Sequence, residues 1–186
     1  MKDAIRIFAL ACVAAVLAAP AFAQAPAAAG APPTLQGDIM KDWSGLKETM
    51  AKLASALPPD KYSFKPTPAQ QSFAERVVHI AQINNRFLAA VGGKATAPTL
   101  DPKAAALNKD AAIKAMNDSF DYGIALLKEQ TDQTLVQPAA MPPGFMGPST
   151  RARMFGFLIG HTWDIYGQLV VYARLNDVTP PASQRP

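Results

Sequence analysis

The feature that most constrains the fold is the helical spacing of the apolar residues, which recurs in four separate blocks. Apolar side chains three and four residues apart fall on one face of a helix, and that face must pack against another element to be buried. No segment shows the sustained alternation with β-branched enrichment that is typical of a strand. The sequence therefore predicts an all-α protein, a single four-helix bundle. The four stripes run over Ile39–Leu57, Phe73–Val91, Ile113–Leu127 and Met154–Leu175.

Proline, glycine and capping residues indicate where these helices begin and end. Pro58-Pro59 stops the first helix, and Gly92-Gly93 ends the second. Thr67-Pro68-Ala69-Gln70 has the pattern of a capping box with proline at the first helical position, which predicts that the second helix begins there. The third and fourth helices are predicted to begin at Asn108 and near Ser149. The connections are long enough to allow a crossover as well as simple up-and-down neighbours.

Residues 1–23 have the three parts of a secretory signal peptide. Lys2 and Arg6 form a basic region, an apolar core follows, and Ala21-Phe22-Ala23 supplies the small-x-small pattern that precedes cleavage. An uncleaved membrane anchor is the alternative, but the apolar run is short for a membrane span and ends at Pro20. The protein is therefore predicted to be periplasmic or secreted, with no stable membrane insertion after the signal is removed.

Composition limits the organisation and the partners that are expected for the chain after the signal peptide. After cleavage, residues 24–35 form an Ala/Pro-rich flexible tether and residues 36–183 form the bundle. The single cysteine, Cys12, leaves with the signal, so the mature protein has no disulfide and no thiolate ligand. The formal net charge is +4, and the basic residues are dispersed, which argues against a nucleic-acid partner. No nucleophile elbow, His-Glu-x-x-His motif or phosphate-binding glycine loop is present.

The chain has only two histidines, and both lie in predicted helices. On a helical wheel His161 falls in the middle of the last apolar stripe, on the same face as Gln168. A buried polar group needs a partner, because leaving it unsatisfied costs roughly 1–3 kcal/mol. His79 lies on the flank of the second stripe. Each histidine has a purely structural alternative, since His161 can bond another core polar group and His79 can be partly exposed.

Two segments carry a resemblance to a known family. One is Tyr62-Ser63-Phe64-Lys65-Pro66-Thr67-Pro68, which leads into the helix with Val78-His79-Ile80. The other runs from His161 to Gln168, continues through Asn176 and ends in a Pro-Pro-Ala-Ser stretch. Together they resemble the DinB family of bacterial bundle proteins, over residues 37–183. The resemblance implies a four-helix bundle with a long crossover connection, often paired as a homodimer.

The resemblance also implies a divalent-metal site, with zinc and nickel among the metals, held by three histidines. By position, two of them are His79 and His161, and the third falls at Ile165. Residues four apart stack on one helix face, so a His-x-x-x-His pair presents two imidazoles to one ion. With Ile165 only two of the three nitrogens remain. Asp164 could complete a two-histidine, one-carboxylate set; otherwise it is a solvated or interhelical carboxylate.

Two functions follow from this pattern. In the first, an exported bundle with a degenerate metal pocket binds a small-molecule ligand or a partner. In the second, the resemblance implies a metal-dependent transferase that uses a low-molecular-weight thiol, with His79, His161 and Asp164 holding the metal. A purely structural dimer is a third alternative. Ile165 favours the first function, because losing a ligand abolishes metal chemistry more readily than it abolishes the fold.

Overall fold

The computed structural model describes residues 32–184, and within them every regular element is a helix. The signal peptide predicted for residues 1–23 and most of the predicted tether lie outside the described residues. No helix within residues 32–184 is apolar over a length that could cross a membrane. The long helices are α1 (Leu35–Ala56), α2 (Phe73–Leu88), α4 (Lys109–Lys128) and α6 (Arg151–Leu175), and the short ones are α3 (Pro102–Ala105) and α5 (Asp132–Leu135).

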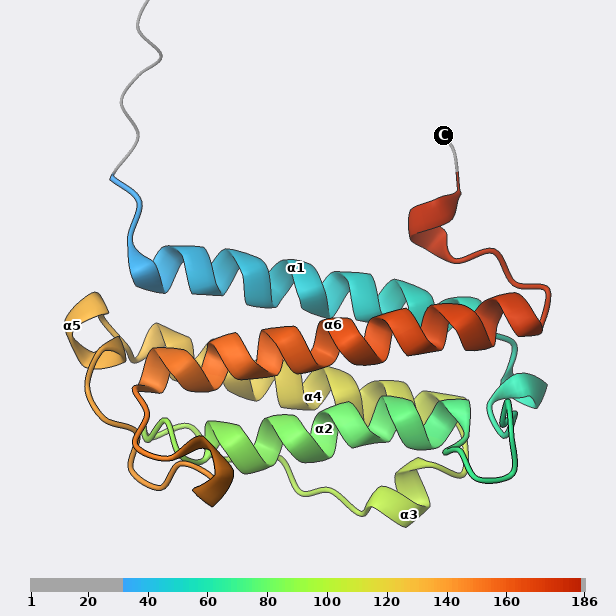
Figure 1. Cartoon of the computed structure of the whole chain (residues 1–186), viewed down its shortest axis with the longest axis horizontal. Coiled ribbons are helices and arrows are strands. Elements are labelled where there is room, and N and C mark those ends of the chain that lie inside the picture. Colours follow the sequence, from blue (N-terminus) through green and yellow to red (C-terminus); the bar gives the residue numbers. More distant parts are fainter. Residues whose placement is uncertain (1–31, 185–186) are drawn as a thin grey trace, which may run out of the picture. The chain divides into compact units, whose positions relative to one another are not determined.

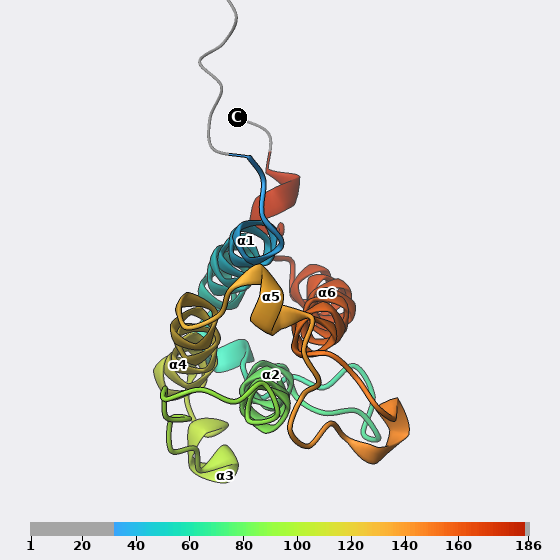
Figure 2. The same ribbon diagram turned by 90° about the vertical axis from the view of Figure 1, so that its left-hand side faces the viewer.

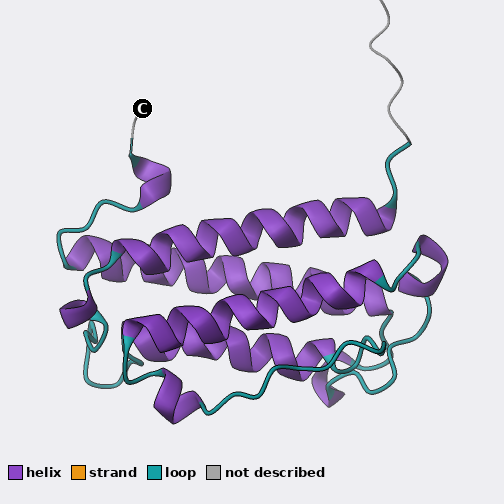
Figure 3. Ribbon diagram, turned by 180° about the vertical axis from the view of Figure 1, so that it is seen from behind, coloured by secondary structure: helices purple, strands orange, loops and turns teal. Residues whose placement is uncertain are grey.

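The four long helices form a bundle in which α1 and α2 are diagonal to each other. Helix α1 packs against α4 and α6, and α2 packs against the same two helices, as the end-on view in Figure 2 shows. Helices α1 and α6 run in one direction, and α2 and α4 run in the other (Figure 1). Because α2 and α4 are parallel neighbours, residues 89–108 must return along the bundle between them, and α3 lies in this connection (Figure 3). The predicted all-α four-helix bundle with a long crossover is confirmed.

The helix starts follow their capping residues, with one correction. Asn108 caps α4 as predicted, its Oδ1 accepting from the Ala111 backbone N–H at 2.7 Å. Helix α2 begins at Phe73 and not at Thr67, so the predicted start was wrong. Its capping box is formed by Ser72 and Glu75, each side chain accepting from the other residue's backbone N–H. Residues 67–70 form a turn instead, because two successive capping patterns compete here and only the second leads directly into the apolar stripe.

Polar contacts between distant segments tie the ends of the bundle. The carboxylate of Asp132 in α5 accepts from the backbone N–H groups of Leu35 and Gln36 at the start of α1. At the other end, the Lys109 ammonium donates to the backbone carbonyl of Leu57, where α1 stops. These contacts satisfy backbone groups that a helix leaves free at its ends. The Lys109 contact also holds the start of α4, where the long crossover connection ends, beside the end of α1.

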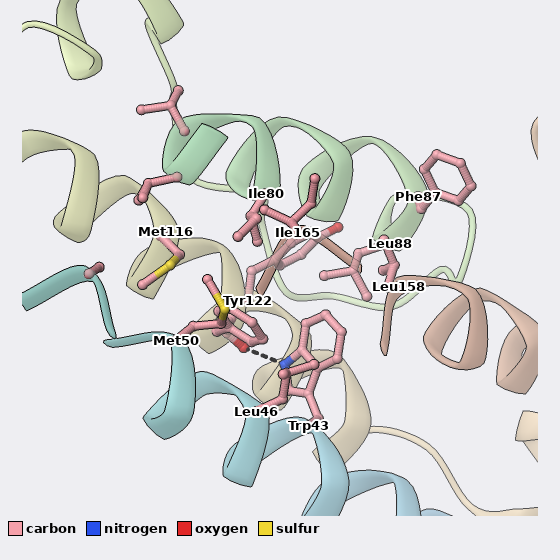
Figure 4. Close-up of a cluster of buried hydrophobic side chains, with 14 of the residues drawn as sticks. Trp43, Leu46, Met50, Ile80, Phe87, Leu88, Met116, Tyr122, Leu158 and Ile165 are labelled. Carbon is pink, nitrogen blue, oxygen red and sulfur yellow. Dashed lines mark hydrogen bonds between the residues drawn. The ribbon is translucent and has the colours of Figure 1, made fainter. Parts of the chain in front are cut away.

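The core is centred on Trp43, which is fully buried in α1 (Figure 4). Its ring lies 4.8 Å from the ring of Phe120 in α4 and 5.6 Å, edge-on, from that of Phe155 in α6. The indole N–H donates to the Phe120 backbone carbonyl at 2.9 Å. This approach requires Gly123 in α4, since a Cβ there would come within 2.6 Å of the indole ring. One side chain therefore joins three of the four helices.

Replacing Gly123 by alanine is expected to destabilise the protein by about 1–3 kcal/mol, because the added methyl overlaps the Trp43 ring. The free energy of unfolding is measured by urea denaturation. Gly45→Ala is the matched control, since a Cβ at that exposed position in α1 would meet no atom within 4 Å. There the higher helix propensity of alanine should stabilise the protein by up to about 1 kcal/mol. Equal stability of Gly123→Ala and wild type would contradict the described packing of Trp43.

Candidate functional site

His79 and His161 come together where α2 packs against α6. Their ring centroids are 5.2 Å apart and the rings are inclined at 69°. Both side chains are half-buried, so the pair lies at the edge of the core and not within it. The two histidines that are far apart in the sequence thus share one place in the fold.

The orientation of α6 differs from the helical-wheel prediction. Its buried face is centred on Leu158, Thr162, Ile165 and Leu169, which places His161 on the flank of the stripe. Most sides of this helix carry apolar residues, so their spacing alone does not show which side faces the core. The position of α6 between α1 and α2 decides it. Ile165 is only 1% exposed and packs among core side chains (Figure 4).

Asp164 lies on the solvent side of α6. Its Oδ2 accepts a hydrogen bond from Gln168 Nε2 at 2.9 Å, and the Asp164 side chain is exposed. Gln168, which was predicted to lie on the core face, is therefore engaged at the surface instead. Within residues 32–184 no three side chains of His, Cys, Asp or Glu lie close enough together to hold a metal ion. In the described part of the chain, the two imidazoles therefore have no third metal-binding side chain beside them.

The distance between the two imidazoles is compatible with two roles, which are the joint binding of one zinc ion and the ordinary packing of two rings. With Zn–N bonds of about 2.1 Å, two imidazoles on one tetrahedral zinc have centroids about 5 Å apart. Ordinary packing of two aromatic rings gives about 4.5–7 Å. The distance therefore does not discriminate between these two roles. Zinc sites in proteins use three or four protein ligands, and two of the three histidines that the family resemblance implies lie together here.

Burial and a nearby cation lower the pKa of both imidazoles. Burial lowers the pKa of His79, and the charges of His161 and Arg76 lower it further. Burial also lowers the pKa of His161, while Asp164 raises it and Arg76 lowers it. The Nε2 atom of His161 is buried and has no hydrogen-bond partner among the described residues. The site thus contains a polar atom that the fold itself leaves unsatisfied.

A row of aromatic rings extends from His161, and the sequence prediction missed it. The ring of Phe157 lies parallel to that of His161, at 2° and a centroid distance of 6.1 Å. Phe157 also stacks on Phe87 of α2 at 4.7 Å. Phe145, in the connection before α6, contacts both phenylalanine rings and is 72% exposed. The four-residue spacing of Phe157 and His161 was the available signal for the first step of this row.

A groove of about 450 Å³ lies on another side of α2, next to α3, and contains neither histidine. In its lining, Ser72 and Glu75 form the capping box and Lys65 pairs with Glu75 at 3.4 Å. Among the described residues, none that line the groove has a buried side-chain nitrogen or oxygen without a hydrogen-bond partner. The histidine pair is the better candidate for a functional site, because its unsatisfied atom calls for a partner.

Lowering the pH from about 7.5 to about 5.5 should reduce the stability of the protein through the histidine pair. The pKa of each imidazole is lowered in the folded state, so the unfolded chain, with its pKa near 6.5, takes up protons first as the pH falls. Stability therefore declines as the pH drops below this value. Urea denaturation at each pH measures the effect, and His79→Gln/His161→Gln should flatten the curve. An unchanged pH dependence in the double variant would refute this origin.

The comparisons with known proteins identify the family. The family model described as the DinB superfamily matches residues 44–169. A DinB-like protein from Bacillus cereus has a similar structure, with a TM-score of 0.64 and 18% identity over 80% of this chain and 96% of that one. A DinB-like protein from Bacillus subtilis gives a TM-score of 0.58 and 19% identity over 80% and 99% of the two chains. No curated protein matches the sequence. The chain belongs to the DinB superfamily.

Proposed function

We propose that this protein is an exported DinB-like bundle that binds a small ligand where His79 and His161 meet, without a resident metal. The observation that carries the proposal is the buried, unpartnered Nε2 of His161 beside a second imidazole. An unsatisfied buried polar atom costs roughly 1–3 kcal/mol. A ligand that hydrogen-bonds to this atom recovers that energy, which supports ligand binding at this place.

The absence of a third ligand among the described residues supports binding over metal chemistry. Ile165 occupies the third family position and is buried in the core, while Asp164 is exposed and bonded to Gln168. Bringing the Asp164 carboxylate to the histidines requires breaking that bond and reorienting the side chain. A neutral imidazole both donates and accepts a hydrogen bond, and the adjacent Phe157 ring offers an apolar contact.

The second candidate is a divalent-metal-dependent enzyme that resembles the thiol transferases of the superfamily. The ring centroids of His79 and His161 are 5.2 Å apart, and this distance suits two imidazoles that share one metal ion. A metal held there would lower the pKa of a bound thiol. His79 and His161 would hold the ion, with Asp164 recruited as the third ligand.

Elemental analysis of the purified mature protein separates the two candidates. We expect zinc and nickel well below one ion per chain, and a melting temperature that a chelator does not change, since two imidazoles bind such ions weakly. Near-stoichiometric metal that is lost in both His161→Ala and Asp164→Ala would contradict the proposal and establish the second candidate.

Restoring the third histidine tests whether the pocket has kept the family geometry. Ile165→His should give the protein tight zinc binding, because the residue stands four positions after His161 on the same helix. Isothermal titration with zinc measures it. Ile165→Asn is the control, since it introduces a polar group of similar cost into the same buried position without an imidazole. Zinc binding that is equally weak in both variants would mean that the two helices no longer converge as the family site requires.

We also propose that the mature protein is periplasmic or secreted and forms a homodimer. Export is supported by the signal pattern of residues 1–23, and pairing by the family resemblance and by the exposed Trp163 and Val171 on the outer side of α6. Mass spectrometry of the protein from the producing cell should give a chain beginning at Gln24. Light scattering should give twice the mass of that chain. A chain that keeps its N-terminal residues would refute cleavage of the signal, and a monomer would refute the homodimer.

A further inference from the structure

Arg76 lies on α2 three residues before His79, one turn away on the same side of the helix. Its side chain is half-buried, and its Nε is buried without a hydrogen-bond partner. None of the ion pairs formed within residues 32–184 includes its guanidinium. Arginine only donates hydrogen bonds and keeps its charge, so a buried guanidinium nitrogen calls for an acceptor, ideally an anion.

The carboxylates on the two helices of this site are engaged elsewhere. Glu75 accepts from the Ser72 backbone N–H at 2.6 Å and pairs with Lys65 at 3.4 Å. Asp164 accepts from Gln168 at 2.9 Å. Neither pairs with Arg76, so within residues 32–184 its positive charge has no ion-pair partner.

His161 supplies a second unsatisfied nitrogen from the opposite helix. Among the described residues its Nε2 and the Nε of Arg76 are both buried and both without a hydrogen-bond partner. Arg76 lies one turn before His79 on α2, and the His79 ring lies 5.2 Å from the ring of His161, so the three side chains gather where the two helices meet. An acceptor group bound at this junction would lie next to donors from both helices.

An apolar surface adjoins this cluster of nitrogens. The Phe157 ring is half-buried and parallel to His161, and the Phe145 ring lies 5.7 Å from Phe157. Phe145 is 72% exposed although it already contacts two aromatic rings. Covering it with a further ring would bury apolar area and give an edge or stacked contact. The site thus has a cationic end and an aromatic end.

We propose that the junction of α2 and α6 binds a small organic carboxylate with an aromatic body. The carboxylate accepts hydrogen bonds from Arg76 and His161, and the ring lies against Phe157 and Phe145. The proposal rests on the proposed function, since it names the ligand class of the same histidine pair. One permanent cation matches a singly charged anion, and a carboxylate has two oxygens to serve two donors on opposing helices. A doubly charged phosphate would leave one charge uncompensated.

Benzoate is the probe, with benzamide as the neutral analogue and acetate as the carboxylate without a ring. Each is titrated into the purified mature protein while the ring signals of the two histidines are followed by NMR. Benzoate should shift both signals in a saturable way, and benzamide and acetate should each bind at least about tenfold more weakly. Equal affinities for benzoate and benzamide would overturn the carboxylate assignment while leaving the histidine pair as a ligand site.

Substitutions then locate the anion. Arg76→Gln should weaken benzoate binding at least about tenfold, because it removes the charge, and Arg76→Lys should recover part of the loss. Arg86→Gln is the matched control, since Arg86 is exposed on the same helix, and it should bind benzoate as wild type does. Circular dichroism checks that the variants are folded.

The exposed Phe145 gives a test at the aromatic end of the site, with a substitution outside α2. Phe145→Ala should weaken benzoate binding and leave acetate binding unchanged, because the ring contacts only the aromatic part of the ligand. Unchanged benzoate binding in both Arg76→Gln and Phe145→Ala, or no binding by any of the three probes, would overturn this inference. The proposed function fails separately, by stoichiometric metal in the elemental analysis.

Discussion

The packing of Trp43 against Gly123 is the contact on which the arrangement of the bundle depends. The indole touches rings from α4 and α6, and its N–H is satisfied by a backbone carbonyl of α4. An aromatic side chain of this size buries a large apolar area, and it can do so at this depth only because the facing residue has no Cβ. The contact draws α1 and α4 together and brings α6 alongside both.

The histidine site is a consequence of this arrangement. Helix α6 lies between α1 and α2, so one of its faces is committed to the core through Leu158, Ile165 and Leu169. The adjacent face of α6 packs against α2 at the edge of the core, and there the half-buried side chains of His161 and His79 lie close together. A site at such an edge is partly desolvated and still lies near the surface. This partial desolvation explains why the pKa of each imidazole is lowered. It also explains why nitrogens there can be buried without a hydrogen-bond partner among the described residues.

The sequence predicted the long helices and the two histidines of the candidate site. Apolar spacing predicted the number of long helices, proline and glycine indicated most of their ends, and Asn108 marked the start of α4. The DinB resemblance correctly placed the chain in its superfamily. That the metal set is incomplete at Ile165 stays a prediction from the resemblance. The two short helices and the start of α2 escaped prediction, because local capping patterns compete and only packing selects between them.

Tertiary structure alone decided which face of α6 is buried and that Asp164 bonds Gln168 at the surface. It alone also decided that the buried Nε of Arg76 has no hydrogen-bond partner within residues 32–184. These features depend on the angular position of one helix against its neighbours. Helix α6 is apolar on most sides, so its apolar pattern does not determine how the helix is rotated about its own axis. The packing of side chains around Trp43 fixes that rotation.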